Sequence, residues 1–470
     1  MLVIESALGR QSIREDISAL DDASGGGGAA EAIAISYFAV PTGADQFDVS
    51  NVPSEAFLGQ AVVINYRPPG ASSFSDSYVY EGVLRTPAIR DPTGASKPLM
   101  NRYLTSEVDL DCTVKGRIFS ISGVYYCQQN AQTHACAHAS LRMALTSRDN
   151  QAVTAAYINK TLGITPPCGG LKLGQVLMII HAQGLDANII DCSGLSPETY
   201  SSILAATVES GSKALLVFTT GSSQPNPDEH VVLVFGHTRN LDEWHPQAIP
   251  AYAGPNSAPY YPSSNWIDHF LIHDDNFGPY YTLSSQALEF EKNVRAHWII
   301  SIRDKATSVD PHGAEASAST VLSLVLPQLA PVEKGRWFEY VTKRSWQYVL
   351  RTVLVTREQY QNHLRQLVGH DGTKVSSAQI TRTGSLPERF WMVEFSLPAL
   401  FTGNRAKLGE VIIAADTATP PTSYLDIIHA IRLPRLLLMT DQSTGQLSYE
   451  LSGLDSHSPV FQTSTHEYQW

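Results

Sequence analysis

Short apolar runs alternate with Pro, Gly and Ser along the first quarter of the chain. After the segment ASGGGGAAEA at 23–32, these runs read AIAISYFAV, QAVVINYRPP, SYVYEGVLR and GRIFSISGVYY. Runs rich in Val, Ile and Tyr between turn residues are typical of β-strands. The pattern therefore predicts an N-terminal segment and glycine-rich linker over 1–32, followed by a mostly β region over 33–120.

The pattern changes to a helical period near residue 136. In CAHASLRMALTSRD, Leu141, Ala144 and Leu145 fall at i, i+3 and i+4 and form one apolar stripe. Two more helices are expected in LKLGQVLMIIHAQG and SPETYSSILAATVESG, and four strands follow in KALLVFTT, HVVLVFGH, HFLIHDD and RAHWIISIRD. Helices first and antiparallel-looking strands second predict an α+β domain over 121–305.

A small, polar stretch, KATSVDPHGAEASAST, follows this domain and predicts a linker over 306–322. Beyond it, strand-like SWQYVLRTVLVT, RFWMVEFSLPAL and KLGEVIIAAD accompany helix-like REQYQNHLRQLV. These runs predict a separate α/β domain over 323–470. A length of 470 residues agrees with two or three domains at roughly 150 residues each.

Composition narrows the function classes. The net charge is −12 and no strong basic run is present, which argues against nucleic acid as the main partner. The N-terminus turns charged within a few residues, so we expect no secretory signal, and the absence of a long apolar run predicts no membrane span. Five cysteines, an odd number without framework spacing, suggest a reduced, cytoplasmic chain.

The segment THACAHAS at 133–140 concentrates reactive side chains around Cys136. A cysteine at a helix N-terminus suits a nucleophile, because the partial positive charge there stabilises a thiolate and free N–H groups can hold an oxyanion. Such chemistry needs an imidazole base and a group that orients it. His230, which opens the strand HVVLVFGH, is a good candidate base.

The orienting group is expected at the end of the strand FLIHDDNFG, where Asp274, Asp275 and Asn276 precede Gly278. Strand alternation predicts that Asp274 and Asn276 share one face and that Asp275 lies on the other.

The ordered set YYCQQNAQTHACAHASLRMAL, HVVLVFGH and LIHDDNFG resembles the papain-like cysteine peptidases over about residues 125–280. The closest branch is that of the bacterial double-glycine (bacteriocin-leader) peptidases. The resemblance implies a papain-like core, a helix bundle plus an antiparallel sheet, that acts as a thiol protease on a protein or peptide substrate without a cofactor. It assigns the nucleophile to Cys136, the base to His230, the orienting carboxylate to Asp274 and the oxyanion-hole glutamine to Gln129.

Alternatives remain open at several positions. Gln128 or Gln132 could replace Gln129, and Asp275 or Asn276 could replace Asp274. The alternatives to His230 as the base are His237, His245, His269 and His273. The chain departs from the family pattern at Ala137, where Gly is usual, and at Asp275, where Pro is usual.

Three other functions compete with the peptidase. One is a papain-like interaction protein without activity, and another is a thiol acyltransferase or transamidase on the same site. The third is a metal-dependent hydrolase, whose ligands would be Cys127, His134, Cys136 and His138, although positions i and i+2 on a helix point apart.

Overall fold

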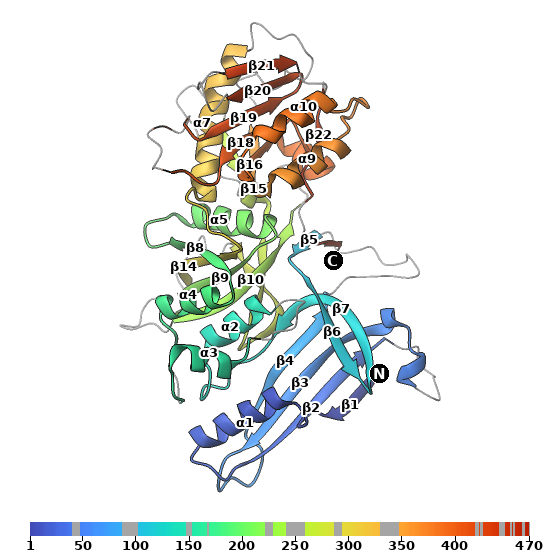
Figure 1. Ribbon diagram of the computed structural model, residues 1–470, viewed down its shortest axis with the longest axis vertical. Helices are drawn as coiled ribbons and strands as arrows, with labels where there is room; N and C mark the ends of the chain where they lie inside the picture. Colours follow the sequence, from blue (N-terminus) through green and yellow to red (C-terminus); the bar gives the residue numbers. More distant parts are fainter. Residues whose placement is uncertain are drawn as a thin grey trace.

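The computed structural model describes most of the chain, and the fold below refers to those residues. They are 1–39, 48–86, 102–146, 153–166, 169–220, 229–240, 259–285, 294–329, 347–418, 423, 426–440, 447–451, 454, 456–462 and 466–469. Three units follow one another along the long axis of the molecule (Figure 1). The architecture is α+β, with mainly antiparallel sheets.

The N-terminal unit is a six-stranded antiparallel sheet covered by one helix. Its strand order is β1-β2-β3-β4-β7-β6. Helix α1 buries Ile13 and Leu20 against Tyr66, Tyr78 and Tyr80 of the sheet. The elements are β1 (Leu2–Ser6), α1 (Gln11–Ala23), β2 (Ala29–Phe38), β3 (Phe57–Arg67), β4 (Asp76–Arg85), β6 (Val108–Val114) and β7 (Arg117–Tyr126), with short 3-10 turns at Val49–Asn51 and Ser54–Ala56.

The first 32 residues belong to this unit, which differs from the predicted separate segment and linker. Strand β1 pairs with β2 along its whole length. The run of glycines forms a tight turn, in which Gly25, Gly26 and Gly27 have positive φ angles of 96°, 78° and 87°. Asp21 accepts hydrogen bonds from the Gly27 and Gly28 N–H groups at 3.1 and 2.8 Å. These positive φ angles favour glycine, so the glycines form a turn. Glycine content alone does not distinguish such a turn from a flexible linker, and the predicted linker was wrong.

The central unit has a second antiparallel sheet with helices on both faces. The strand order is β13-β12-β10-β9-β14-β8, and β5 and β23 continue from one end of β10. Each of the three predicted helices and four predicted strands is present. The elements are β5 (Arg102–Thr105), α2 (Cys136–Leu145), α3 (Ala155–Leu162), α4 (Leu173–Ala182), β8 (Asp186–Asp191), α5 (Pro197–Glu209), β9 (Lys213–Thr220), β10 (Glu229–Arg239), the 3-10 turn Ser263–Trp266, β12 (His269–Asp274), β13 (Gly278–Ser284), β14 (Val294–Arg303) and β23 (His466–Gln469).

One hydrophobic core joins the first two units. It runs from Phe57 and Phe119 of the N-terminal sheet through Leu141 of α2 to Leu233 and Phe235 of β10. The predicted boundary near residue 120 therefore falls inside a continuous core. Helix α2 packs between the two sheets, and this packing fixes the position of its N-terminal residue.

The C-terminal unit is built on a third sheet, of order β11-β15-β16-β18-β19-β20-β21. Its strands are antiparallel except for the β11–β15 pair, so it is α+β rather than the predicted α/β. Its elements are β11 (Tyr260–Pro262), α7 (Pro311–Leu329), β15 (Tyr348–Thr356), α9 (Arg357–Gln366), α10 (Ser377–Arg382), the 3-10 turn Thr383–Ser385, β16 (Arg389–Ser396), α11 (Pro398–Asn404), β17 (Ala406–Lys407), β18 (Gly409–Ala414), β19 (Ile428–Leu433), β20 (Leu436–Thr440), β21 (Leu447–Leu451) and β22 (Ser458–Pro459).

Helix α7 corrects the linker predicted over 306–322. Asp310 accepts a hydrogen bond from the Gly313 N–H at 2.7 Å and so caps the first turn. Ala314, Ala318, Val321 and Leu322 are buried against the third sheet. Their spacing of i, i+4, i+7 and i+8 is that of an amphipathic helix, and small Ala and Ser residues hid this stripe.

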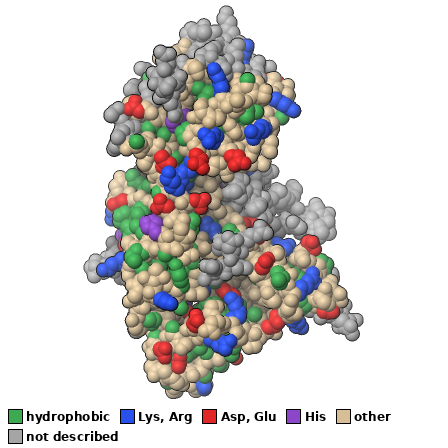
Figure 2. Space-filling model, viewed as in Figure 1, with side chains coloured by type: hydrophobic (Ala, Val, Ile, Leu, Met, Phe, Trp, Pro, Cys, Tyr) green, Lys and Arg blue, Asp and Glu red, His purple; other side chains and the backbone are tan. Residues whose placement is uncertain are grey.

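Positively and negatively charged side chains are intermixed on the surface. On the face shown in Figure 2, Lys and Arg side chains alternate with Asp and Glu and do not gather into one patch. Within the described residues, no helix combines the length and the apolar character that crossing a membrane requires.

Candidate active site

Cys136 is the first residue of α2, as the sequence predicts. The residue before it, Ala135, is extended, with φ −107° and ψ −179°, so the helix begins abruptly at the cysteine. Helix α2 packs on β10, β7 and β9. Ser140 donates a hydrogen bond to the Val231 carbonyl at 2.9 Å, which ties the helix to β10 one residue beyond His230. Cys136 itself is half-buried.

His134 fixes the loop that leads into the helix. Its Nε2 donates to the Gln128 carbonyl at 2.8 Å, and its Nδ1 accepts from the Thr133 hydroxyl at 3.0 Å. Asn130 accepts hydrogen bonds from the N–H groups of Gln132 and Thr133 in the same loop. Burial lowers the pKa of His134 to about 4, so this ring is neutral.

His138 holds the first turn of α2. Its Nδ1 accepts the Ala135 N–H at 3.3 Å, the reach-back contact of a capping box. Its Nε2 donates to Asn159 of α3 at 3.0 Å, and Asn159 donates in turn to the Thr133 carbonyl at 2.8 Å. Burial lowers the pKa of His138 to about 4. The two histidines that flank Cys136 are thus neutral structural groups.

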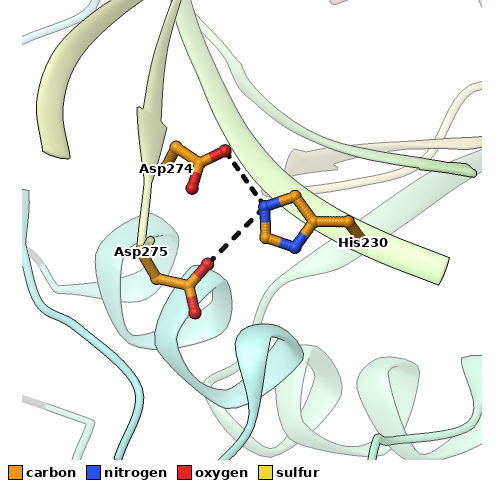
Figure 3. Close-up of side chains that lie close together, drawn as sticks. All are labelled: His230, Asp274 and Asp275. Atoms are coloured by element: carbon orange, nitrogen blue, oxygen red, sulfur yellow. Dashed lines mark hydrogen bonds and ion pairs between the residues drawn. The ribbon is translucent and has the colours of Figure 1, made fainter. Parts of the chain in front are cut away.

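His230 lies one residue after the start of β10 and links Cys136 to a carboxylate. Its Nε2 is 3.0 Å from an oxygen of Asp274, and its side chain also hydrogen-bonds Cys136. Because Nε2 faces the carboxylates (Figure 3), Nδ1 is left for the cysteine. The edge-to-face contact with Phe218, with ring centroids 5.6 Å apart, steadies the imidazole.

The protonation of His230 follows from these contacts. Burial by itself lowers the pKa of His230, but the hydrogen bonds to Asp274 and Cys136 outweigh it and raise the pKa to about 10. Burial raises the pKa of Asp274, whereas its bonds to His230 and to the turn lower it, and the net pKa lies below the ordinary value. At neutral pH the pair is an imidazolium beside a carboxylate.

Asp274 ends β12 and begins a turn. One of its oxygens accepts the N–H groups of Asn276 and Phe277 at 2.8 and 3.1 Å, while the other faces His230. The pairing of β12 with β13 shifts register between Ile272 and Asp274. Both oxygens of the carboxylate are therefore held, which suits a group that orients an imidazole.

The register shift overturns the alternation expected for the next two residues. Asp275 is fully buried and lies 3.8 Å from His230 Nε2, on the side where Asp274 also lies. Asn276 is exposed and turns away to accept a hydrogen bond from Gln129 at 2.9 Å. Strand periodicity fails here because the chain has already entered the turn.

The three candidate glutamines occupy different places. Gln129 contacts the turn that carries Asp274 through Asn276. Gln128 binds the edge of β4, where its side chain accepts the Val79 N–H at 2.8 Å. Gln132 is exposed on the loop before α2. Gln129 therefore contacts the turn that carries Asp274, whereas the side chain of Gln128 contacts β4.

The four residues of the metal-hydrolase hypothesis do not converge. Cys127 is buried and its thiol contacts the Ala139 carbonyl at 3.5 Å, and burial raises its pKa to about 11. His134 and His138 are engaged as described above. Among the described residues, the group whose donor atoms come close enough for a metal ion is His230, Asp274 and Asp275, within 4.8 Å of one another. Cys168 lies outside the described residues.

Two cavities lie elsewhere in the molecule. One, of about 590 Å³, is bordered by β1, β3 and β6, and the other, of about 760 Å³, lies between the central and C-terminal units. Neither is lined by Cys136 or His230. The reactive side chains are therefore identified by their chemistry and not by either of these cavities.

The residues that hold this site in place could not be predicted from the sequence. Arg142 of α2 is fully buried and donates to the carbonyls of Tyr80 and Val153, which anchors the helix to the first sheet. Asn159 also gave no signal beyond its place in a short helix. The available clue for Arg142 was a charged residue beside the apolar stripe of a predicted helix.

A scan of protein-family models finds no match to the chain, and a search of curated proteins finds none. The function is therefore inferred from the geometry of Cys136, His230 and Asp274.

Proposed function

We propose that the protein is a papain-like cysteine peptidase whose triad is Cys136, His230 and Asp274. The observation that carries the proposal is the double contact of His230, which hydrogen-bonds Cys136 and places Nε2 3.0 Å from Asp274. A nucleophile, a base and an orienting carboxylate joined in this order are the elements of thiol acyl transfer. Cys136 is half-buried, so part of its surface remains accessible.

The chemistry follows from the contacts. The Cys136 sulfur attacks a peptide carbonyl, and its proton is held by His230. His230 then gives that proton to the leaving amine, so the C–N bond breaks and an acyl-enzyme remains. Water, deprotonated by His230, releases the acid and restores the thiol. The Asp274 carboxylate keeps the imidazole oriented throughout. None of these steps requires a cofactor.

The oxyanion of the tetrahedral intermediate needs donors near the sulfur. The first N–H groups of a helix have no partner within the helix, and Cys136 is the first residue of α2. The side-chain amide of Gln129, beside the carboxylate turn, is the proposed second donor. If an amine takes the place of water, the same acyl-enzyme supports transamidation.

We propose that the substrate is a protein or peptide in the cytoplasm. The N-terminal and C-terminal units are proposed to assist the reaction. The N-terminal sheet shares its core with α2 and supports the nucleophile. The C-terminal unit is proposed to recognise or gate the substrate.

An electrophilic peptide tests the proposal. We expect a peptidyl acyloxymethyl ketone ending in Gly-Gly, the sequence cut by the resembled peptidases, to add covalently to Cys136 in the full chain. Intact mass and peptide mapping measure the adduct. It should be absent in Cys136→Ser and form roughly tenfold or more slowly in His230→Ala.

Cys112→Ser, which removes a buried thiol, is the matched control and should label like the wild type. Equal labelling of the wild type and His230→Ala, or no adduct at Cys136, would overturn the proposal.

A further inference from the structure

Asp275 has no role in the proposed triad, yet it is buried beside it. Its exposed fraction is 2%, and neither carboxylate oxygen has a hydrogen-bond partner in another residue of the described chain. Buried polar groups almost always have hydrogen-bond partners, because burying a polar group without one is costly. A buried carboxylate without a hydrogen-bond partner is a candidate ligand for a cation.

The geometry around Asp275 is convergent. Figure 3 shows its carboxylate and that of Asp274 directed at the same ring nitrogen of His230. The distances from Nε2 are 3.8 Å to Asp275 and 3.0 Å to Asp274, and the three donor atoms lie within 4.8 Å of one another. Ligands of a tetrahedral zinc ion, about 2.0–2.2 Å from the metal, are separated by roughly 3.3 Å. The cluster is thus near the size that such an ion requires.

We propose that His230, Asp274 and Asp275 form a Zn²⁺ site that inhibits the peptidase. The site would supply one imidazole nitrogen and two carboxylate oxygens, with water as the fourth ligand. Two carboxylates leave surplus negative charge for a divalent cation, and the imidazole favours zinc over magnesium or calcium. The inhibitory part of this inference rests on the proposed function, whereas zinc binding does not.

Inhibition follows because the metal would bind Nε2 of His230. Zn²⁺ binds the lone pair of Nε2, so the proton that Nε2 shares with Asp274 leaves to solvent. The remaining proton is on Nδ1, facing Cys136. Loss of that proton to a leaving amine would create an imidazolate, and Nδ1 cannot accept a proton from the thiol. Zinc therefore blocks both proton transfers without occupying the sulfur.

Zinc binding is measured first, on the full chain stripped with a chelator. A chromophoric zinc chelator competes with the protein for added Zn²⁺. We expect one zinc ion per chain, and affinity reduced at least about tenfold in Asp275→Asn. The exposed Asp191→Asn is the matched control and should bind like the wild type. Cys136→Ser should retain the affinity, because the sulfur is not a ligand.

Cobalt gives a second readout that needs no variant. Co²⁺ bound to the wild-type chain should show tetrahedral absorption without a thiolate-to-cobalt band. Such a band, unchanged zinc affinity in Asp275→Asn, or lost affinity in Cys136→Ser would each overturn the site.

Labelling of Cys136 separates this inference from the proposed function. Zn²⁺ should slow labelling of the wild type by the electrophilic peptide, whereas Mg²⁺ should not. If zinc binds as expected but the metal-free Cys136 accepts no probe, the zinc site stands and the peptidase fails. If Cys136 labels equally with and without bound zinc, inhibition is refuted.

Discussion

At the scale of residues, the segment THACAHAS separates into one reactive and two structural side chains. His134 and His138 each have both ring nitrogens engaged, and burial lowers the pKa of each ring to about 4. Cys136 instead contacts His230, which is 94 residues away in sequence (230 minus 136). Residue types alone could not make this division, because it depends on what each ring nitrogen meets in the fold.

Asp274→Ala tests the orienting role at this scale. Removing the carboxylate leaves the imidazole free to rotate, and misplacement of a catalytic group costs on the order of a hundredfold in rate. We expect labelling of Cys136 by the electrophilic peptide to slow by about this factor. Asp191→Ala, which removes an exposed carboxylate, should label at the wild-type rate. Equal rates for the two variants would exclude Asp274 from the triad.

At the scale of elements, the site is where one helix N-terminus and two strand ends meet. The sequence predicted α2, β10 and β12 because their apolar periods are clear. It placed Cys136, His230 and Asp274 at the ends where the structure has them. It failed at Asp275, since a register shift before the turn cannot be read from alternation. It also failed at 311–329, where a helix stripe is made of alanines.

Asn159→Ala tests how α3 supports the start of α2. The substitution removes the acceptor of the buried His138 Nε2–H and the amide that donates to the Thr133 carbonyl, so we expect the free energy of unfolding to fall by about 1–3 kcal/mol. Chemical denaturation measures it. Lys160→Ala, at the next and exposed position of the same helix, should change it by less than about 0.5 kcal/mol. Similar effects of both changes would contradict the proposed support.

At the scale of the whole molecule, a buried chain of charges joins the central and C-terminal units. Glu209 of α5 accepts hydrogen bonds from His237 and from Arg351 of β15 at 3.1 and 2.5 Å. Arg351 also donates to Glu394 at 2.7 Å, and Glu394 accepts from Lys407 at 2.5 Å. These residues lie far apart in sequence, so no local pattern could reveal their pairing.

Arg351→Met tests this junction. It leaves Glu209 and Glu394 without their shared cation, and breaking a buried pair costs about 3–5 kcal/mol. We expect a loss of stability of that size by denaturation. Arg10→Met, which breaks the more exposed Arg10–Glu81 pair, should cost less than about 1 kcal/mol. A small effect at Arg351 would show that this chain of charges contributes little to holding the two units together.

The buried charges at this junction predict that the stability of the protein depends on pH. Burial by itself raises the pKa of Glu209, but Arg351 and His237 outweigh it and hold the pKa well below the ordinary 4.5. Because the folded-state pKa is depressed, this stabilisation is present above about pH 4.5 and is lost as the pH falls below it. The stability gap between the wild type and Arg351→Met should therefore narrow on acidification.

The alkylation rate of Cys136 in the metal-free chain tests whether Cys136 and His230 act as a catalytic pair. Iodoacetamide is applied to the wild type and to His230→Ala at about pH 6.5, and the labelled cysteine is identified by peptide mapping. If the Cys136–His230 pair is real, Cys136 reacts faster than the buried cysteines, and the rate falls roughly tenfold or more in His230→Ala. If Cys136 reacts no faster than they do, or at the same rate in both chains, the peptidase account is wrong.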